Sequence, residues 1–167
     1  MELTFTPMRP ADIAPLTPIM KRAFDEDTRL HLGRPAGGPT GYADGSFLRQ
    51  WGLHKESAAF CIWHGGTLMG GVILWLRDKT QHNTLGCIFL DLAFQNRGIG
   101  TRVWQCIEAS YPETRVWEAE TPLYSRRNQH FYIDKCGFAA VAMRDPQDEE
   151  HGMFVLQKRM PGWAEEI

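Results

Sequence analysis

A short stretch with two glycines and an arginine has the composition of a site for a charged phosphate group. It reads Gln-Asn-Arg-Gly-Ile-Gly-Thr over residues 95–101, between a predicted apolar strand and a predicted helix. The start of a helix leaves four backbone N–H groups without partners inside the helix, and the helix dipole adds partial positive charge there. Gly98 and Gly100 keep side chains away from these amides, while Arg97 adds a fixed charge and Thr101 a hydroxyl. The stretch therefore predicts an anion site suited to a pyrophosphate.

Two glycines at this spacing are a weak signal by themselves, since a tight strand-to-helix turn without any ligand explains them equally well. The stretch is not a P-loop, because the Gly-Lys-Ser/Thr ending is missing. It is not a dinucleotide-binding fingerprint either, because the third glycine is absent and the preceding strand is the fourth of the chain instead of the first. The elements on either side of the stretch are therefore needed to identify the ligand of the site.

The elements around this stretch predict a mixed α/β domain. The near-continuous apolar run over residues 84–94 predicts a central strand buried on both faces. Ile99, Val103, Cys106 and Ile107 form one helical stripe after the glycines. Further strands are predicted over residues 3–8, 58–64, 68–76, 115–121, 138–143 and 153–158, and further helices over residues 13–24, 47–53 and 126–135.

Glycines also mark places where the backbone needs special geometry. Gly70 and Gly71 interrupt the strand over residues 68–76, which indicates a bulge or the close approach of another backbone. Gly137 stands where a left-handed cap of the preceding helix is expected. The Gly- and Pro-rich segment over residues 31–43 is predicted to be a mobile loop.

Length and composition restrict the class of protein. The 167 residues suit one domain, predicted over residues 1–160 with a C-terminal tail over residues 161–167. The net charge of −2 gives no support for a nucleic-acid or membrane partner. The six histidines are scattered, and the four cysteines, expected to be buried thiols, form no CxxC pair, so no metal site is expected. Unpaired cysteines and the lack of a secretory signal favour a cytoplasmic protein.

Two motifs together resemble a known family. Residues 95–101, placed after an apolar strand, resemble the acyl-CoA motif of the GNAT superfamily of N-acyltransferases. About 30 residues further on, the run over residues 128–138 resembles the second motif of that family, Asn-x-x-Phe-Tyr-x-x-x-Gly-Phe. The order of predicted elements is similar along nearly the whole chain. The resemblance implies a GNAT-like α/β fold in three layers, with a mixed, mostly antiparallel sheet of six to seven strands and about four helices.

The resemblance also implies roles for individual residues. The backbone of Ile88 and Leu90 is implied to pair with the pantetheine arm and the acetyl carbonyl of acetyl-CoA. Tyr132 lies where the family often places a general acid for the leaving thiolate, although packing in the core is the alternative. Asn128 lies four residues earlier, on the same helix face. The residues implied to bind the cofactor are Ile88, Leu90, Gln95, Asn96, Arg97, Gly98, Ile99, Gly100, Thr101, Asn128 and Tyr132.

Three positions depart from the family pattern. Leu92 stands where the family often has a proline, and Gln95 where arginine is more usual. Ser125 stands where an asparagine that contacts the pantetheine is often found.

Candidates for the base that deprotonates the amine are Glu120, Glu118 and Asp91. Glu118 and Glu120 share one face of their predicted strand, and all three have the alternative of being structural carboxylates. The loop over residues 31–43 lies in the region that usually shapes the acceptor pocket in this family. Four aromatic residues could form walls of this pocket: Trp51, Trp63, Trp75 and Tyr124. The alternative is that they pack in the core or at a dimer interface.

The sequence thus predicts an acetyl-CoA-dependent N-acetyltransferase that acts on an unidentified amine of a small molecule or peptide. The alternatives are a non-catalytic acyl-CoA-binding module, which would sense or regulate, and a binder of nucleotide phosphates. The sequence does not decide the oligomeric state, although an exposed last strand would offer its edge to a second copy in a homodimer.

Overall fold

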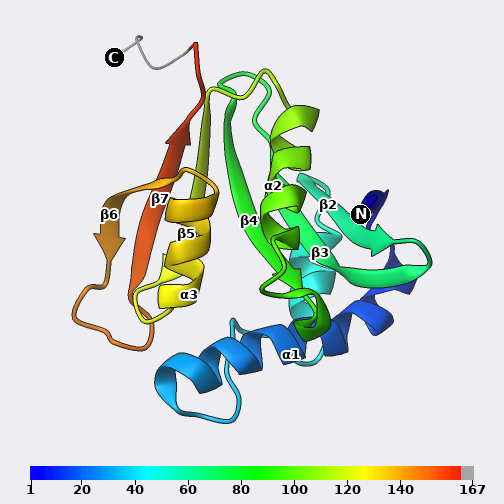
Figure 1. Ribbon diagram of the computed structural model, residues 1–167, viewed down its shortest axis with the longest axis vertical. Helices are drawn as coiled ribbons and strands as arrows, with labels where there is room; N and C mark the ends of the chain where they lie inside the picture. The colour runs from blue at the N-terminus through cyan, green and yellow to red at the C-terminus, as the bar shows by residue number, and fades with distance from the viewer. Residues whose placement is uncertain (163–167) are drawn as a thin grey trace. The chain divides into compact units, whose positions relative to one another are not determined.

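A seven-stranded mixed sheet forms the framework of the protein in the computed structural model, which describes residues 1–162 (Figure 1). The strand order is β1-β2-β3-β4-β5-β7-β6, with β4 and β5 parallel and the pairs β1–β2, β2–β3, β5–β7 and β6–β7 antiparallel. The predicted mixed, mostly antiparallel sheet is therefore confirmed. The strands are β1 Thr4–Pro7, β2 Ser57–His64, β3 Thr67–Trp75, β4 His82–Leu90, β5 Val116–Pro122, β6 Ala139–Arg144 and β7 Met153–Arg159.

The helices fall where the sequence places them, with different bounds. The first, α1 Ile13–Leu32, runs on past the predicted end near Phe24 and stops at Gly33, whose φ of 67° is left-handed. The predicted helix over residues 126–135 changes from α to π geometry at His130. The helical elements are η1 Pro10–Asp12, α1 Ile13–Leu32, η2 Leu48–Gly52, η3 Leu92–Phe94, α2 Ile99–Ser110, α3 Arg126–Gln129 and η4 His130–Lys135.

The chain divides into two compact units. The first unit comprises Met1–Trp75 and Gly86–Ile99, and the second comprises Leu76–Leu85 and the residues from Gly100 onward. The predicted domain over residues 1–160 stays a prediction, and the predicted tail lies outside the described residues from position 163 on.

In the first unit, α1 packs its apolar stripe against the sheet. Leu16 and Met20 are fully buried in one core cluster with Ile73 of β3 and Phe89 of β4. The periodicity that predicts this helix therefore also identifies the face that it buries.

Gly70 brings β3 and β4 unusually close together. A Cβ atom at Gly70 would lie 2.0 Å from the carbonyl oxygen of Phe89, so no side chain fits there. The register of β2 with β3 also shifts here, because Ile62 pairs with Gly70 while Trp63 pairs with Leu68. The structure thus contains both the bulge and the close approach that the paired glycines indicate.

In the second unit, α2 packs on β5 through aromatic side chains. The rings of Trp104 and Trp117 meet edge to face at 5.2 Å, and Phe138 lies 5.2 Å from Trp104. Cys106 is exposed, so its predicted place in the buried stripe of α2 is wrong, and Trp104 supplies the buried surface in its stead. The reason is that Trp104 packs on Trp117, and a residue two positions further along a helix lies on nearly the opposite side.

Cysteines and histidines are dispersed through the fold. Cys61, Cys87 and Cys136 are buried, as expected, and burial raises the pKa of the Cys87 thiol to about 12. Within residues 1–162, no group of three or more His, Cys, Asp or Glu side chains is arranged to hold a metal ion. Over the same residues, no helix combines the length and the apolar character needed to cross a membrane.

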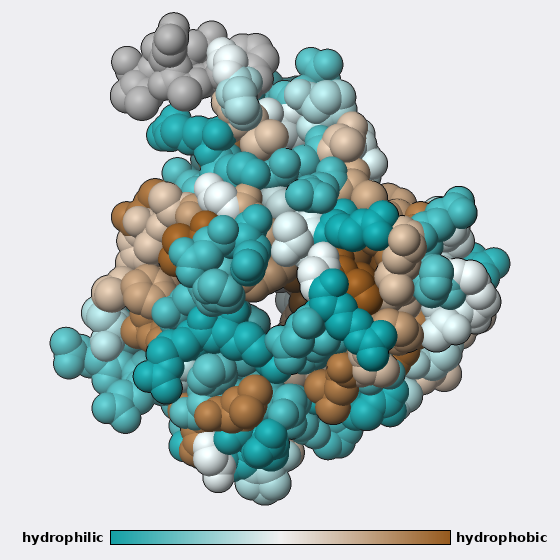
Figure 2. Space-filling model, in the orientation of Figure 1, coloured by the Kyte–Doolittle hydropathy of each residue, from teal (hydrophilic) through white to brown (hydrophobic). Residues whose placement is uncertain are grey.

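The last strand is not at the edge of the sheet, so that part of the homodimer argument is wrong. β7 pairs with β5 from Met153 to Arg159 and with β6 on its other side. The edge strand next to β7 is β6, while β1 is the edge at the other end of the sheet. Every residue of β6 is exposed, including Val141 and Met143. Apolar side chains gather over β6 at the left of the surface view (Figure 2). A homodimer stays a prediction, with β6 as its candidate edge.

Candidate active site

The second half of β4 turns alternate peptide groups away from β3. The carbonyl oxygen of Phe89 faces Gly70, and the Asp91 amide donates to the carbonyl oxygen of Met69 at 2.8 Å. Because peptide groups alternate in direction along a strand, those of Ile88 and Leu90 point to the opposite edge. The register of β4 with β5 ends at Thr84, so Ile88 and Leu90 lie beyond it.

Asp91 ends the strand and starts the turn that follows. Its Oδ1 accepts a hydrogen bond from the Leu92 amide at 2.9 Å, which caps η3. Arg22 of α1 donates two hydrogen bonds to the same carboxylate, at 3.0 Å and 2.7 Å. These hydrogen bonds keep the pKa of Asp91 below its usual value. The prediction of a strand through Phe94, buried on both faces, is therefore wrong beyond Leu90. Leu92 lies in η3 with 40% of its surface exposed.

The glycine-rich stretch begins as a left-handed turn tied back to the strand. The side-chain amide of Gln95 donates to the carbonyl oxygen of Leu90 at 2.9 Å. Asn96 and Gly98 both adopt positive φ, at 61° and 75°. A Cβ at Gly98 would meet nothing within 4 Å, so glycine is favoured here by the backbone conformation and not by crowding from neighbouring atoms.

Helix α2 starts at Ile99, directly after this turn. Ile99 is buried, whereas Arg97 is exposed. Gly100 and Thr101 follow in the first turn of the helix and belong to the second unit. The predicted arrangement of strand, glycine turn and helix start is thus present, with the orphan amides of a helix N-terminus.

The second motif forms a capped helix that buries a tyrosine. Ser125 is fully buried and is the N-cap of α3, where its hydroxyl accepts from the Asn128 amide at 3.3 Å. Tyr132 is 8% exposed in the π-helical segment η4, and its ring packs edge to face with Phe131 and Phe138. Gly137, at φ 86°, is the predicted left-handed residue at the end of this helix. π-Helical turns occur frequently at functional sites.

The two glutamates of β5 share one half-exposed face, as predicted. Glu118 accepts a hydrogen bond from the side-chain amide of Gln157 at 3.1 Å. Glu120 forms an ion pair with Arg144 at 2.6 Å. Each candidate carboxylate, including Asp91, is therefore held by a donor from another element.

The segment predicted as a mobile loop is tied to α1. Asp25 accepts hydrogen bonds from the Gly37 amide, at 3.1 Å, and from the Tyr42 hydroxyl. The hydroxyl of Thr28 donates to the Gly37 carbonyl at 2.8 Å. Burial and the neighbouring Asp25 raise the pKa of Tyr42 to about 12, so its hydroxyl stays a donor at neutral pH.

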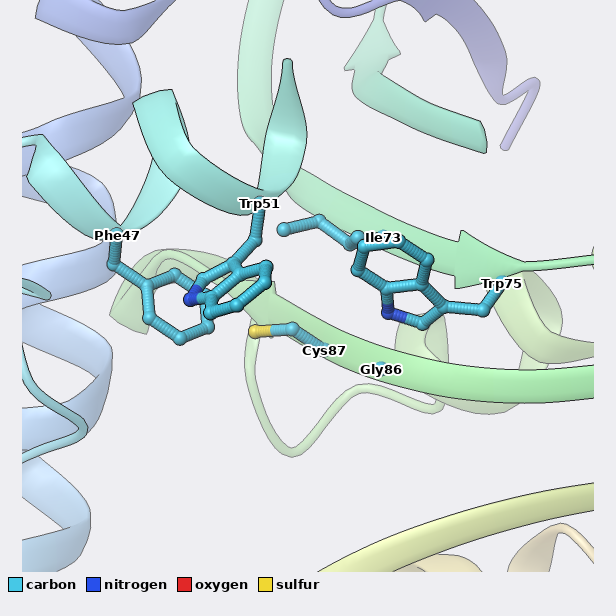
Figure 3. A pocket seen from close by; sticks show the side chains of 6 residues that line it. All are labelled: Phe47, Trp51, Ile73, Trp75, Gly86 and Cys87. Carbon is cyan, nitrogen blue, oxygen red and sulfur yellow. The ribbon is translucent and has the colours of Figure 1, made fainter. Parts of the chain in front are cut away.

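An aromatic pocket lies in the first unit, beside the strand that carries Ile88 and Leu90 (Figure 3). Its volume is about 370 Å³. The indoles of Trp51 and Trp75 meet edge to face at 6.1 Å. The residues that line it are Phe47, Trp51, Ile73, Trp75, Gly86 and Cys87.

Two of the four predicted aromatic walls, Trp51 and Trp75, line this pocket. Trp63 does not, since its indole N–H donates to the Thr6 hydroxyl at 2.8 Å; Tyr124 lies in the second unit. Sequence reasoning missed Gly86, where a Cβ would lie 2.7 Å from Nε1 of Trp75. The available signal was a glycine inside an apolar strand, which often marks a close approach.

The family-model comparison identifies the chain. Residues 21–138 match the model of the acetyltransferase (GNAT) family. This match spans both motifs and most of the chain, so the protein belongs to the acetyltransferase (GNAT) family. The family predicted from the two motifs is confirmed.

One curated relative is similar to part of the chain. The uncharacterized protein YrkN of Bacillus subtilis (strain 168) is 36% identical over 85 residues, which are 51% of this chain and 46% of that protein. The match thus spans about half the length of that relative.

Two solved structures share the fold. An acetyltransferase from Thermus thermophilus has a TM-score of 0.76 at 16% identity, over 96% of this chain and 98% of that one. The PaiA N-acetyltransferase from Thermoplasma acidophilum, in complex with coenzyme A, has a TM-score of 0.72 at 13% identity, over 96% of this chain and 100% of that one.

The ion pair of Arg22 with Asp91 generates the first prediction. Asp91→Asn keeps the oxygen that accepts from Leu92 and removes the charge. We expect it to lower the free energy of unfolding at pH 7 by about 1 kcal/mol, a modest value because Arg22 is half exposed to solvent. The folded pKa of Asp91 is depressed, so the wild-type advantage is present above about pH 4 and disappears as the pH falls through the lower folded pKa. Urea unfolding across this pH range measures the difference.

Arg22→Gln is the matched partner of this variant. Asp91→Asn, Arg22→Gln and the double mutant form a double-mutant cycle. Its coupling energy measures the interaction between the two side chains. Strictly additive effects of the two substitutions would show that the pair does not stabilise the end of β4.

Proposed function

We propose that this protein is an acetyl-CoA-dependent N-acetyltransferase that acetylates a primary amine of a small molecule or peptide by direct attack in a ternary complex. One observation carries the proposal. The peptide groups of Ile88 and Leu90 point away from β3, just before a left-handed glycine turn and a helix start. An extended amide edge followed by an anion site suits a ligand with an amide-containing arm and a pyrophosphate.

In this proposal the backbone of Ile88 and Leu90 pairs with the pantetheine arm, and one of their amides donates to the acetyl carbonyl as negative charge develops on its oxygen. The stretch over residues 95–101 holds the pyrophosphate, with Arg97 as the exposed cation. The side chain of Gln95 stabilises the turn by donating a hydrogen bond to the carbonyl oxygen of Leu90, so its role in the site is structural. Asn128 contributes to the pantetheine end. Ser125, which occupies the family's asparagine position, acts as a helix cap.

The reaction requires three proton transfers. The acceptor arrives as an ammonium ion, loses one proton to a base, and its neutral nitrogen attacks the thioester carbon. As the C–N bond forms and the C–S bond breaks, the nitrogen loses a second proton and the leaving thiolate takes one to become the thiol of coenzyme A. The net products are an N-acetylated amine, coenzyme A and one released proton.

We assign Tyr132 as the donor of the proton to the thiolate. Its ring is fixed between Phe131 and Phe138, and such packing limits the phenol to one orientation, as a general acid requires.

For the base, Glu120 and Asp91 are the candidates, with Glu118 as a third. The ion pair with Arg22 lowers the pKa of Asp91 and so makes it a weaker base. Glu120 is likewise paired with an arginine, Arg144. In one alternative, Asp91 or Glu120 accepts the proton of the ammonium ion through a water molecule. In the other, these carboxylates have only a structural role and stabilise the positions of neighbouring elements. This pairing is also what a non-catalytic acyl-CoA-binding module would show.

The test of the function is the release of free thiol from acetyl-CoA in the presence of a panel of primary amines. We expect at least one amine to raise thiol release well above the background hydrolysis of the thioester. Tight binding of acetyl-CoA without any amine-dependent thiol release would favour the binding module. Thermal protection by ATP and none by coenzyme A would favour a binder of nucleotide phosphates.

Tyr132→Phe tests the proton donor. The phenyl ring keeps the edge-to-face packing and removes only the hydroxyl, so we expect kcat to fall about 100-fold while the affinity for acetyl-CoA changes little. Steady-state kinetics and calorimetric titration with coenzyme A separate the two effects.

Tyr111→Phe is the control in the same unit, because Tyr111 packs on Trp117 at 6.2 Å and belongs to neither motif. A wild-type rate in Tyr132→Phe would rule out the general-acid role.

A further inference from the structure

We propose that the pocket lined by Phe47, Trp51, Ile73, Trp75, Gly86 and Cys87 receives the acceptor, and that the acceptor is a primary amine carrying one aromatic or similarly apolar ring. The proposal rests on the proposed function and names the substrate class that it leaves open. All six lining residues lie in the first unit.

The pocket lies close to the place where the acetyl group is proposed to sit. Gly86 and Cys87 immediately precede Ile88 on β4. A strand rises about 3.3 Å per residue, so Gly86 lies roughly 7 Å from Ile88 along the strand. A ring held beside Gly86 would place an amine on a short carbon arm within reach of Ile88 along the strand.

The chemistry of the walls selects against polar acceptors. The six lining residues contribute two indoles and one phenyl ring, and none of the six carries a charge. The thiol of Cys87 stays neutral, because burial raises its pKa to about 12. A molecule with several charged or hydroxyl groups would lose hydration here without a partner. A single ammonium group at the edge of the pocket is tolerated, since indole faces attract cations.

The volume is sufficient for an acceptor with one ring. A cavity of about 150 Å³ holds a benzene ring, and this pocket has about 370 Å³. One ring with a short aminoalkyl arm, or a fused pair of rings, therefore fits. An aromatic side chain next to a peptide N-terminus would also fit.

The walls are held in place before any ligand arrives. The ring of His54 stacks on Trp51 at 6.2 Å and meets Trp75 edge to face at 5.1 Å. Nδ1 of His54 accepts from the Glu56 amide at 3.0 Å, which fixes the imidazole. Figure 3 shows the side chains of Trp51, Trp75 and Cys87 converging on the pocket from three different elements. Preformed walls of this kind reduce the entropy lost on binding.

The experiment compares phenethylamine and tryptamine with ethanolamine and spermidine, using kcat/KM in the thiol-release assay. We expect the two ring amines to be preferred at least tenfold. Trp51→Ala removes a wall that is already 37% exposed, so the fold should tolerate it. We expect it to lower kcat/KM for ring amines about 10-fold or more without changing the KM for acetyl-CoA.

Leu30→Ala is the matched control, because Leu30 is a 49% exposed apolar side chain of the same unit, outside the pocket. It should leave the kinetics unchanged. A preference for ethanolamine or spermidine that Trp51→Ala does not alter would overturn the pocket proposal and leave the acetyltransferase function standing.

Calorimetric titration with phenethylamine, in the presence of coenzyme A, measures binding to the pocket even if no amine is acetylated. Binding that Trp51→Ala weakens and Leu30→Ala preserves would support a ring-amine site while the proposed function fails. No binding to the wild-type protein would overturn the proposal.

Discussion

The contact on which this site depends is the close approach of two backbones at Gly70 and Phe89. Because Gly70 has no side chain, the carbonyl of Phe89 can lie directly against β3, where a Cβ would leave no room for it. The alternation of a strand then sends the peptide groups of Ile88 and Leu90 to the other edge. Asp91 ends the strand immediately afterwards, and Arg22 holds it to α1. A substitution at Gly70, far in the sequence from the residues proposed to react, would therefore disturb the edge on which the acetyl-CoA proposal rests.

The sequence predicts the local parts of this arrangement well. The strands, the glycine turn and the cap at Gly137 follow from residues that are neighbours in the chain. The end of β4 does not, because it depends on a pairing between Arg22 and Asp91, which lie 69 positions apart. The place of β7 between β5 and β6 likewise reflects long-range strand pairing. Cys106 follows the helical period, yet packing of Trp104 on Trp117 decides which side is buried.

The proposed binding roles separate into a general part and a specific part. The edge of β4 and the glycine turn are proposed to bind groups that every acyl-CoA carries, so they concern the cofactor and say nothing of the amine. The aromatic pocket carries the specific information, because its walls come from η2, β3 and β4 and it has no charged lining residue. The sequence offers Trp51 and Trp75 as candidate walls among four aromatic residues, and only the fold shows which of them meet and that Gly86 leaves room for Trp75. The class of acceptor is therefore inferred from the three-dimensional structure and not from a motif.

Residue-resolved amide hydrogen exchange, with and without saturating coenzyme A, tests the central claim most directly. If the edge of β4 binds the pantetheine arm, the amides of Ile88 and Leu90 should become strongly protected on binding. The amide of Asp91, which already donates to Met69, should change much less and is an internal control. Unchanged exchange at Ile88 and Leu90 under saturating coenzyme A, or an equal change at Asp91, would contradict the account.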